Sequence, residues 1–144
     1  MKGILAIMVA TSVIFLSAHI GGTKKSSPID GAWKLVWAKS NGTLVDVSKN
    51  QQIKFFADGC FSLLASDADG KIDYAGYGTF ELQQSSYNET FLYHNNPEYV
   101  GAMDWQEVEL KGDTLYAKGF KKVIIKGKET NDFPAIEEKR VRMP

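Results

Sequence analysis

Short strand-like runs separated by turn residues fill most of this chain, and this pattern limits the possible folds more than any other feature. Asn41-Gly42, Asp58-Gly59, Asp69-Gly70 and Gly112-Asp113 supply residues that tolerate positive φ where a hairpin must reverse. No apolar repeat at helical spacing joins the runs, so any helix should be short, near 47–51 or 96–100. The runs rich in β-branched and aromatic residues are 32–39, 51–56, 60–66, 72–82, 87–94, 103–110, 114–120 and 135–142, with 123–126 as an extension or extra strand.

This pattern predicts an all-β fold, an antiparallel up-and-down β-barrel of eight to ten strands. Short hairpins make sequential strands neighbours, and closure removes exposed sheet edges. A sandwich of two Greek-key sheets is the alternative.

The first residues have the composition of an export signal. A positive Met1-Lys2 precedes an uncharged apolar stretch, which is typical of a secretory signal peptide. The alternative is an uncleaved anchor, because residues 3–22 approach the ~20 residues that span a bilayer. We therefore expect a periplasmic or secreted protein without stable membrane association once the signal is removed. The predicted organisation is a signal peptide or N-terminal anchor (1–22), a flexible lead-in (23–29) and one barrel domain (30–144).

Composition narrows the classes of partner and cofactor. The 144 residues contain 17 Lys plus Arg and 17 Asp plus Glu, so no net charge favours nucleic acid. Cys60 is the single cysteine and has no internal disulfide partner. Outside the predicted signal only His94 remains, so a His/Cys metal cluster is not expected and no cofactor is predicted.

Strand alternation assigns side chains to the predicted lumen. In the run 87–94, Glu89 shares a face with Tyr87, Phe91 and Tyr93. If that face points inward, burial of Glu89 costs several kcal/mol unless it is paired or protonated, which suits a polar group that orients an apolar ligand. The alternative is that the face points outward, or that Glu89 is hydrogen-bonded in a filled core. The further lumen candidates are Tyr74, Phe80 and Trp105, with Phe55 and Phe61 beside them; His94 is expected at an exposed rim.

No catalytic motif is present, and the sequence does not predict an enzyme. There is no nucleophile elbow, and the histidine needed for a serine triad is missing. Glu89, Asp104, Glu107 and Glu109 are ordinary in number for a surface. An enzyme would require two carboxylates, or one beside His94, in a single cleft.

Several short motifs occur in order along the chain, at residues 31–36, 52–59 with Phe61, 76–80, 87–89 with Tyr93, 96–97, 112–116 and 139–141. Together they resemble the lipocalin-like (calycin) proteins, and more narrowly the small secreted lipocalin-like domains of Bacteroidetes type. The resemblance implies an exported barrel without established catalysis and with a cavity for hydrophobic small molecules. It also implies that Glu89 and Tyr93 contact the ligand and that the indole of Trp33 lies under the guanidinium of Arg140 or Arg142 as a plug of one barrel end.

Two functional hypotheses follow. The first is a monomeric, non-enzymatic barrel that binds an unidentified hydrophobic or amphipathic small molecule in its lumen. The second is an envelope interaction or inhibitor module with a solid core that acts through its loops. A cavity of at least about 300 Å³ bordered by Glu89 would favour the first hypothesis.

Overall fold

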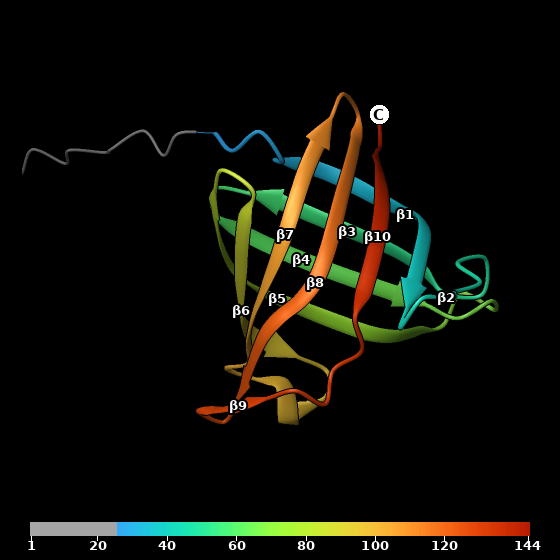
Figure 1. Ribbon diagram of the computed structural model, residues 1–144. Helices are drawn as coiled ribbons and strands as arrows, with labels where there is room; N and C mark the ends of the chain where they lie inside the picture. The colour runs from blue at the N-terminus through green and yellow to red at the C-terminus, as the bar shows by residue number, and fades with distance from the viewer. Residues whose placement is uncertain (1–25) are drawn as a thin grey trace, which may run out of the picture.

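The computed structural model describes residues 26–144 and consists almost entirely of antiparallel strands (Figure 1). The predicted signal peptide and the first residues of the lead-in lie outside the described residues. Of the two predicted short helices, only the second forms, as the 3-10 turn η1. The elements are β1 (Gly31–Ser40), β2 (Thr43–Leu44), β3 (Gln51–Ala57), β4 (Cys60–Ser66), β5 (Ile72–Gln83), β6 (Ser86–His94), η1 (Pro97–Tyr99), β7 (Met103–Lys111), β8 (Thr114–Ile125), β9 (Lys128–Thr130) and β10 (Ile136–Arg142).

The sheet closes on itself, as the sequence predicts. Its strand order is β10-β1-β3-β4-β5-β6-β7-β8, and β10 also pairs with β8. Trp33 of β1 stands opposite Arg142 of β10, and Ser40 stands opposite Ile136. Eight strands therefore form the barrel, while β2 and β9 are short additions to β1 and β8.

The two ends of the barrel differ. In Figure 1, β7, β8 and β10 cross in front of β3, β4 and β5, and the C-terminus lies near the start of β1. The turn η1 and the short β9 lie together at the opposite end. No helix within residues 26–144 has the length and apolar character needed to cross a bilayer.

Trp33 closes the end of the barrel where β1 begins. Its side chain is fully buried, and Nε1 donates a hydrogen bond of 2.7 Å to the carbonyl of Ile29. The guanidinium carbon of Arg142 lies 4.3 Å from the indole centroid, and Arg142 Nη2 donates to the carbonyl of Pro28 at 3.1 Å. Arg142 therefore covers the indole, and Arg140 lies deeper in the barrel.

The half of the barrel next to Trp33 is filled by aromatic packing. Phe56 makes edge-to-face contacts with Phe80 and Tyr87, at centroid distances of 5.1 Å and 6.0 Å. Phe80 also stacks on Tyr87 at 5.8 Å. Aromatic pairs of this geometry stabilise a core by about 0.5 to 1.5 kcal/mol beyond their buried area.

A bulge between β5 and β6 reverses the strand alternation. Tyr77 pairs with Tyr93 while Gly78 pairs with Phe91, which leaves Leu92 as the extra residue. One extra residue moves every following side chain to the other face. As a result Tyr93 points outward and His94 points inward.

Gly78 allows β5 to approach β6 closely at this bulge. A Cβ atom at position 78 would lie 1.9 Å from the backbone oxygen of Thr90 and 2.9 Å from the ring of Phe61. No side-chain rotation relieves a contact with backbone, so only glycine fits without moving the strands.

We predict that Gly78→Ala lowers the free energy of unfolding by at least about 3 kcal/mol, because the strands must separate to admit the methyl group. The matched control is Thr79→Ala, which removes an exposed side chain from the next position and should cost less than about 1 kcal/mol. Urea unfolding followed by circular dichroism measures both. Equal losses in the two variants would contradict this explanation.

Candidate ligand-binding cavity

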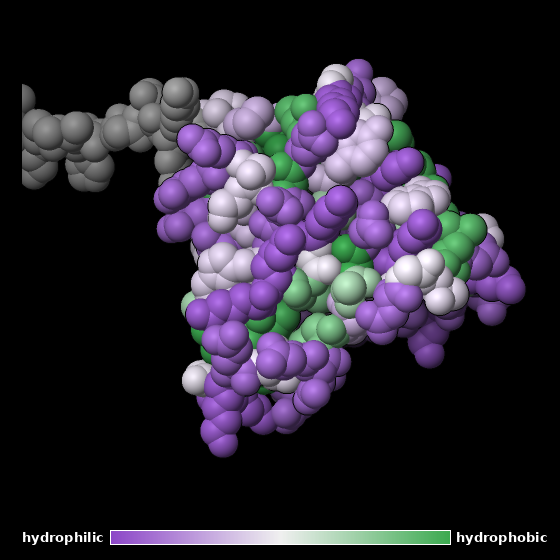
Figure 2. Space-filling model, in the orientation of Figure 1, coloured by the Kyte–Doolittle hydropathy of each residue, from purple (hydrophilic) through white to green (hydrophobic). Residues whose placement is uncertain are grey.

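A cavity of about 280 Å³ occupies the half of the barrel away from Trp33. Glu89 borders this cavity, but the volume is slightly below the value of about 300 Å³ at which the range for small-molecule sites begins and which the sequence-based prediction set as favouring a binding barrel. Figure 2 shows mostly hydrophilic side chains on one face of the molecule, with apolar side chains visible in the hollow beside β8 and β10. The residues that line the cavity are Gln52, Lys54, Leu63, Tyr74, Glu89, Phe91, Tyr99, Ala102, Met103, Asp104, Gln106, Phe120, Val123, Ile125, Phe133, Ile136, Glu138 and Arg140.

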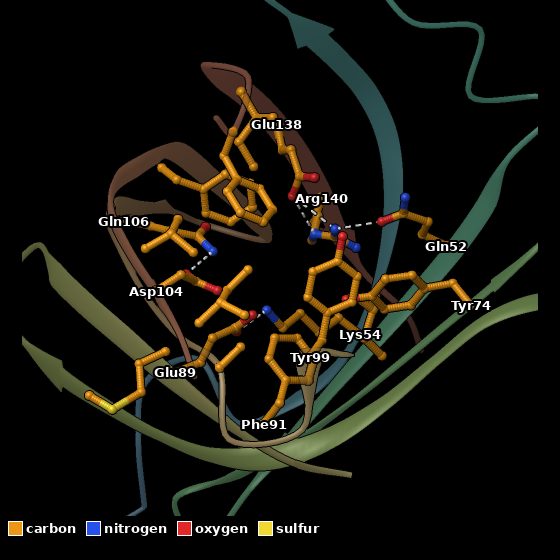
Figure 3. Close-up of a pocket in the computed structure, with 18 residues that line it drawn as sticks. Gln52, Lys54, Tyr74, Glu89, Phe91, Tyr99, Asp104, Gln106, Glu138 and Arg140 are labelled. Atoms are coloured by element: carbon orange, nitrogen blue, oxygen red, sulfur yellow. Dashed lines mark hydrogen bonds and ion pairs between the residues drawn. The ribbon is translucent and has the colours of Figure 1, made fainter. Parts of the chain in front are cut away.

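A buried ion pair between Lys54 of β3 and Glu89 of β6 crosses the barrel (Figure 3). The side chains are 8% and 4% exposed, and Lys54 Nζ and Tyr87 Oη both donate hydrogen bonds to Glu89 Oε2. The ammonium of Lys54 also lies 4.8 Å from the ring centroid of Phe61. Removing one partner of such a buried pair typically costs 3 to 5 kcal/mol, because the other charge is left uncompensated.

Asp104 of β7 stands directly opposite Glu89. Its Oδ1 accepts a hydrogen bond of 2.8 Å from Gln106 Nε2. Burial raises the pKa of Asp104 well above its ordinary value, and the adjacent charge of Glu89 raises it further. Asp104 therefore keeps its proton at a pH at which an exposed carboxyl group is ionised.

A second ion pair joins two residues of β10, the buried Arg140 and the partly buried Glu138. Arg140 donates from Nε and Nη2 to Glu138 Oε2 at 3.1 Å and 2.8 Å. Nη2 also donates to Gln52 Oε1 of β3 at 2.9 Å. Nη1 is buried and has no hydrogen-bond partner among the described residues.

These polar side chains form a layer across the barrel. Lys54, Gln106, Glu138 and Arg140 border the cavity on one side and a void of about 20 Å³ toward the filled half on the other. We call Gln52, Lys54, Glu89, Asp104, Gln106, Glu138 and Arg140 the polar layer. It forms the floor of the cavity.

Aromatic and aliphatic side chains line the opposite end of the cavity. Phe133 lies in the segment between β9 and β10. Its ring centroid is 5.4 Å from that of Phe120 and 6.3 Å from that of Tyr99. Val123 and Ile125 of β8 line the same cavity. We call Tyr99, Phe120, Val123, Ile125 and Phe133 the apolar mouth. The cavity is therefore polar at its floor and apolar at its mouth.

His94 lies inside the barrel and is only 4% exposed, so the expectation of an exposed rim residue is wrong. Its ring packs edge-on against Tyr74, Phe91 and Tyr99, at 4.5 Å, 5.3 Å and 4.9 Å. Nδ1 accepts a hydrogen bond of 2.9 Å from the backbone N–H of Asn96. Burial lowers the pKa of His94, which favours the neutral ring.

The predicted ligand residues that point into the barrel fall into two groups. Glu89, Phe91 and Tyr74 line the cavity. Tyr87 and Phe80 belong to the filled half, although Tyr87 reaches Glu89 through its hydroxyl.

Three predicted lumen residues lie on the outer face instead. Tyr93 is 57% exposed because of the bulge at Leu92. Trp105 alternates with the inward-facing Asp104 and Gln106, and Lys122 lies over its ring on the outside. Phe55 likewise alternates with the inward-facing Lys54 and Phe56, and is 42% exposed.

Most of the polar layer was not predicted as ligand-binding. The signal for Lys54 and Gln52 was present, because both share strand parity with the core residue Phe56. Glu138 and Arg140 similarly share parity with Arg142, which covers Trp33. The apolar mouth had no comparable signal, since Phe133 lies in a loop.

Two of the four carboxylates considered for catalysis meet in one cavity. Glu89 and Asp104 both line it, while Glu107 and Glu109 are exposed and pair with Lys121 and Lys111. Within residues 26–144, no three His, Cys, Asp or Glu side chains are grouped as a metal site would require.

Comparison with known proteins supports the fold alone. No family model matches the chain, and a search of curated proteins gives no significant match. A similar solved structure is that of an uncharacterized protein from Bacteroides eggerthii DSM 20697, with a TM-score of 0.52 and 14% sequence identity. The match covers 79% of this chain and 98% of that protein.

We predict that Asp104→Asn stabilises the protein, because an amide keeps the bond from Gln106 and cannot ionise beside Glu89. The raised pKa means that the folded protein holds a proton that the unfolded chain has released. Stability is therefore lost as pH rises from about 4 through the folded pKa. At about pH 8 the variant should be more stable by on the order of 1 to 3 kcal/mol.

Denaturant titrations between about pH 4 and pH 8 measure this difference, which should shrink toward the acid end. Asp73→Asn changes an exposed carboxylate and is the control, with an expected effect within about 0.5 kcal/mol. A pH-independent difference for Asp104→Asn would contradict the assignment.

Proposed function

We propose that this protein is an exported lipocalin-like barrel that binds one small amphipathic molecule without transforming it. The observation that carries the proposal is the cavity bounded by a polar floor and an apolar mouth. Ligand sites typically combine apolar walls with a few convergent polar groups. The volume of about 280 Å³ favours a small ligand.

The buried charges support binding over a purely structural role. One ion pair is buried and the other is partly buried, and such pairs are rarely better for stability than apolar residues of similar volume. Here both pairs border a cavity that a ligand can occupy, and Arg140 Nη1 has no hydrogen-bond partner among the described residues. A barrel that served only as a solid scaffold would not need them.

The alternative of a solid interaction module matches only one half of the molecule. Trp33, Phe56, Phe80 and Tyr87 fill the end next to Arg142. The other half encloses the cavity, so the proposal places binding there and not on the loops.

An enzymatic role has one observation in its favour, the paired carboxyl groups of Glu89 and Asp104. Such pairs supply general acids and bases when both groups are free to exchange protons. Glu89 is engaged here by Lys54 and Tyr87, and Asp104 by Gln106. This engagement favours binding without catalysis.

Family and location form the finer part of the proposal. The closed eight-stranded barrel and the contact of Arg142 with Trp33 agree with a lipocalin-like protein. Export rests on the predicted signal peptide, and the proposal includes a monomer in the periplasm or outside the cell.

We predict that the protein binds 1-octanol in isothermal titration calorimetry and that Ile125→Trp, which fills the mouth, weakens binding at least about tenfold, or about 1.4 kcal/mol. Ile124→Trp is the matched control, since Ile124 is adjacent and does not line the cavity. It should change affinity less than about threefold.

Two results would contradict the proposal. One is the absence of binding by 1-octanol and by the charged octyl compounds described below. The other is equal affinity in the Ile125→Trp variant and the unmodified protein. Circular dichroism of both tryptophan variants shows whether the barrel is retained.

A further inference from the structure

We propose that the ligand carries an oxygen acceptor, such as a carboxylate, that binds Arg140 and Tyr74 at the polar floor while its apolar part occupies the mouth. This inference rests on the proposed function and specifies the chemical class and orientation of the ligand. It distinguishes an acid or other oxygen-bearing head group from an amine.

The guanidinium of Arg140 supplies the main evidence. A guanidinium has five N–H donors, of which two belong to Nη1. Nε and Nη2 are used by Glu138 and Gln52, but Nη1 has no partner among the described residues. Because Arg140 is 4% exposed and lines the cavity, bulk water does not compensate for these donors.

Tyr74 adds a second donor on the same side of the cavity. Figure 3 shows Arg140, Gln52 and Tyr74 on one side, and Glu89, Asp104 and Gln106 on the other. Gln52 and Tyr74 also border a common surface hollow, so Tyr74 lies close to the hydrogen-bond partner of Arg140. Burial raises the pKa of Tyr74 well above its ordinary value, so its hydroxyl keeps the proton that it can donate.

Each carboxyl group of the polar layer already accepts at least one hydrogen bond. Glu89 accepts from Lys54 and Tyr87, and Glu138 accepts twice from Arg140. Asp104 accepts from Gln106 and retains its own proton.

Each cation of the floor is therefore paired with one carboxylate, and burial raises the pKa of the third carboxyl group, that of Asp104. A ligand oxygen atom would supply the acceptor that the two N–H groups of Arg140 Nη1 lack, whereas an ammonium group would bring another donor to these cations. Hydrogen bonds from a guanidinium to a carboxylate are about twice as strong as neutral ones.

The apolar mouth fixes the orientation. Phe120, Phe133 and Ile125 line the end of the cavity away from the floor. A chain that left the head group toward Gln106 or Lys54 would meet the filled half, so the apolar part must extend toward Phe133.

The test compares octanoate, 1-octanol and octylamine by calorimetry at about pH 8, where the acid and the amine both carry their charges. The chains are equal in length, so differences in affinity report the head group. We expect octanoate to bind at least about tenfold more tightly than octylamine, or about 1.4 kcal/mol, with 1-octanol between them.

The double variant Glu138→Gln/Arg140→Gln removes the guanidinium without leaving an unpaired buried charge. It should still bind 1-octanol, and its preference for octanoate over octylamine should fall below about threefold. Glu137→Gln/Lys139→Gln makes the same charge changes at the two neighbouring positions that alternate with Glu138 and Arg140, and should keep the preference. Circular dichroism confirms that both double variants are folded.

The outcomes separate the two proposals. No binding by any octyl compound refutes the proposed function itself. Binding with a smaller preference, or with a preference that Glu138→Gln/Arg140→Gln retains, overturns only the head-group assignment. In that case a water molecule in the small void beside the floor is the better partner for Nη1.

Discussion

The antiparallel pairing of β1 with β10 determines most of what is distinctive in this protein. It sets Trp33 opposite Arg142, and the guanidinium then covers the indole. Because alternate residues share a face, the same register turns Arg140 and Glu138 into the lumen. One register thus seals one end of the barrel and places charge at its centre.

The central charges would be a liability without their partners. Lys54 and Glu89 come from strands on different sides of the barrel, and each compensates the burial of the other. Asp104 forms no ion pair among the described residues, and burial raises its pKa, which favours the protonated form. Burying these charged groups costs desolvation free energy that a continuous apolar core would avoid. The polar layer is therefore consistent with a role in recognising a polar group rather than in stabilising the barrel.

The fold could be predicted from the sequence because its signals are local. Turn dipeptides and strand alternation placed the eight barrel strands close to their observed bounds. Trp33 was predicted as a plug under Arg140 or Arg142, and the structure shows that Arg142 covers it. Parity also placed Glu89 and Phe91 inside. It failed at Tyr93, because the bulge at Leu92 leaves no composition signal in a single chain.

The cavity could be predicted only in part, for two physical reasons. Lys54 was overlooked because lysine is rarely buried, although its strand position required it to point inward. The contacts of Phe133 with Phe120 and Tyr99 depend on the path of a loop, which strand alternation does not describe. Strand alternation therefore predicts the strands of the barrel better than it predicts the side chains that line the cavity.

The mouth is formed differently from the rest of the wall. β8 extends beyond the residues that pair with β10, and β9 pairs with this extension. Phe133 follows β9, so it lines the cavity from a segment that is not one of the barrel strands. Rotating that one ring away would break aromatic contacts and no strand hydrogen bonds. For the proposed ligand, exchange with solvent would then require only side-chain motion, on a timescale far shorter than that of separating the strands.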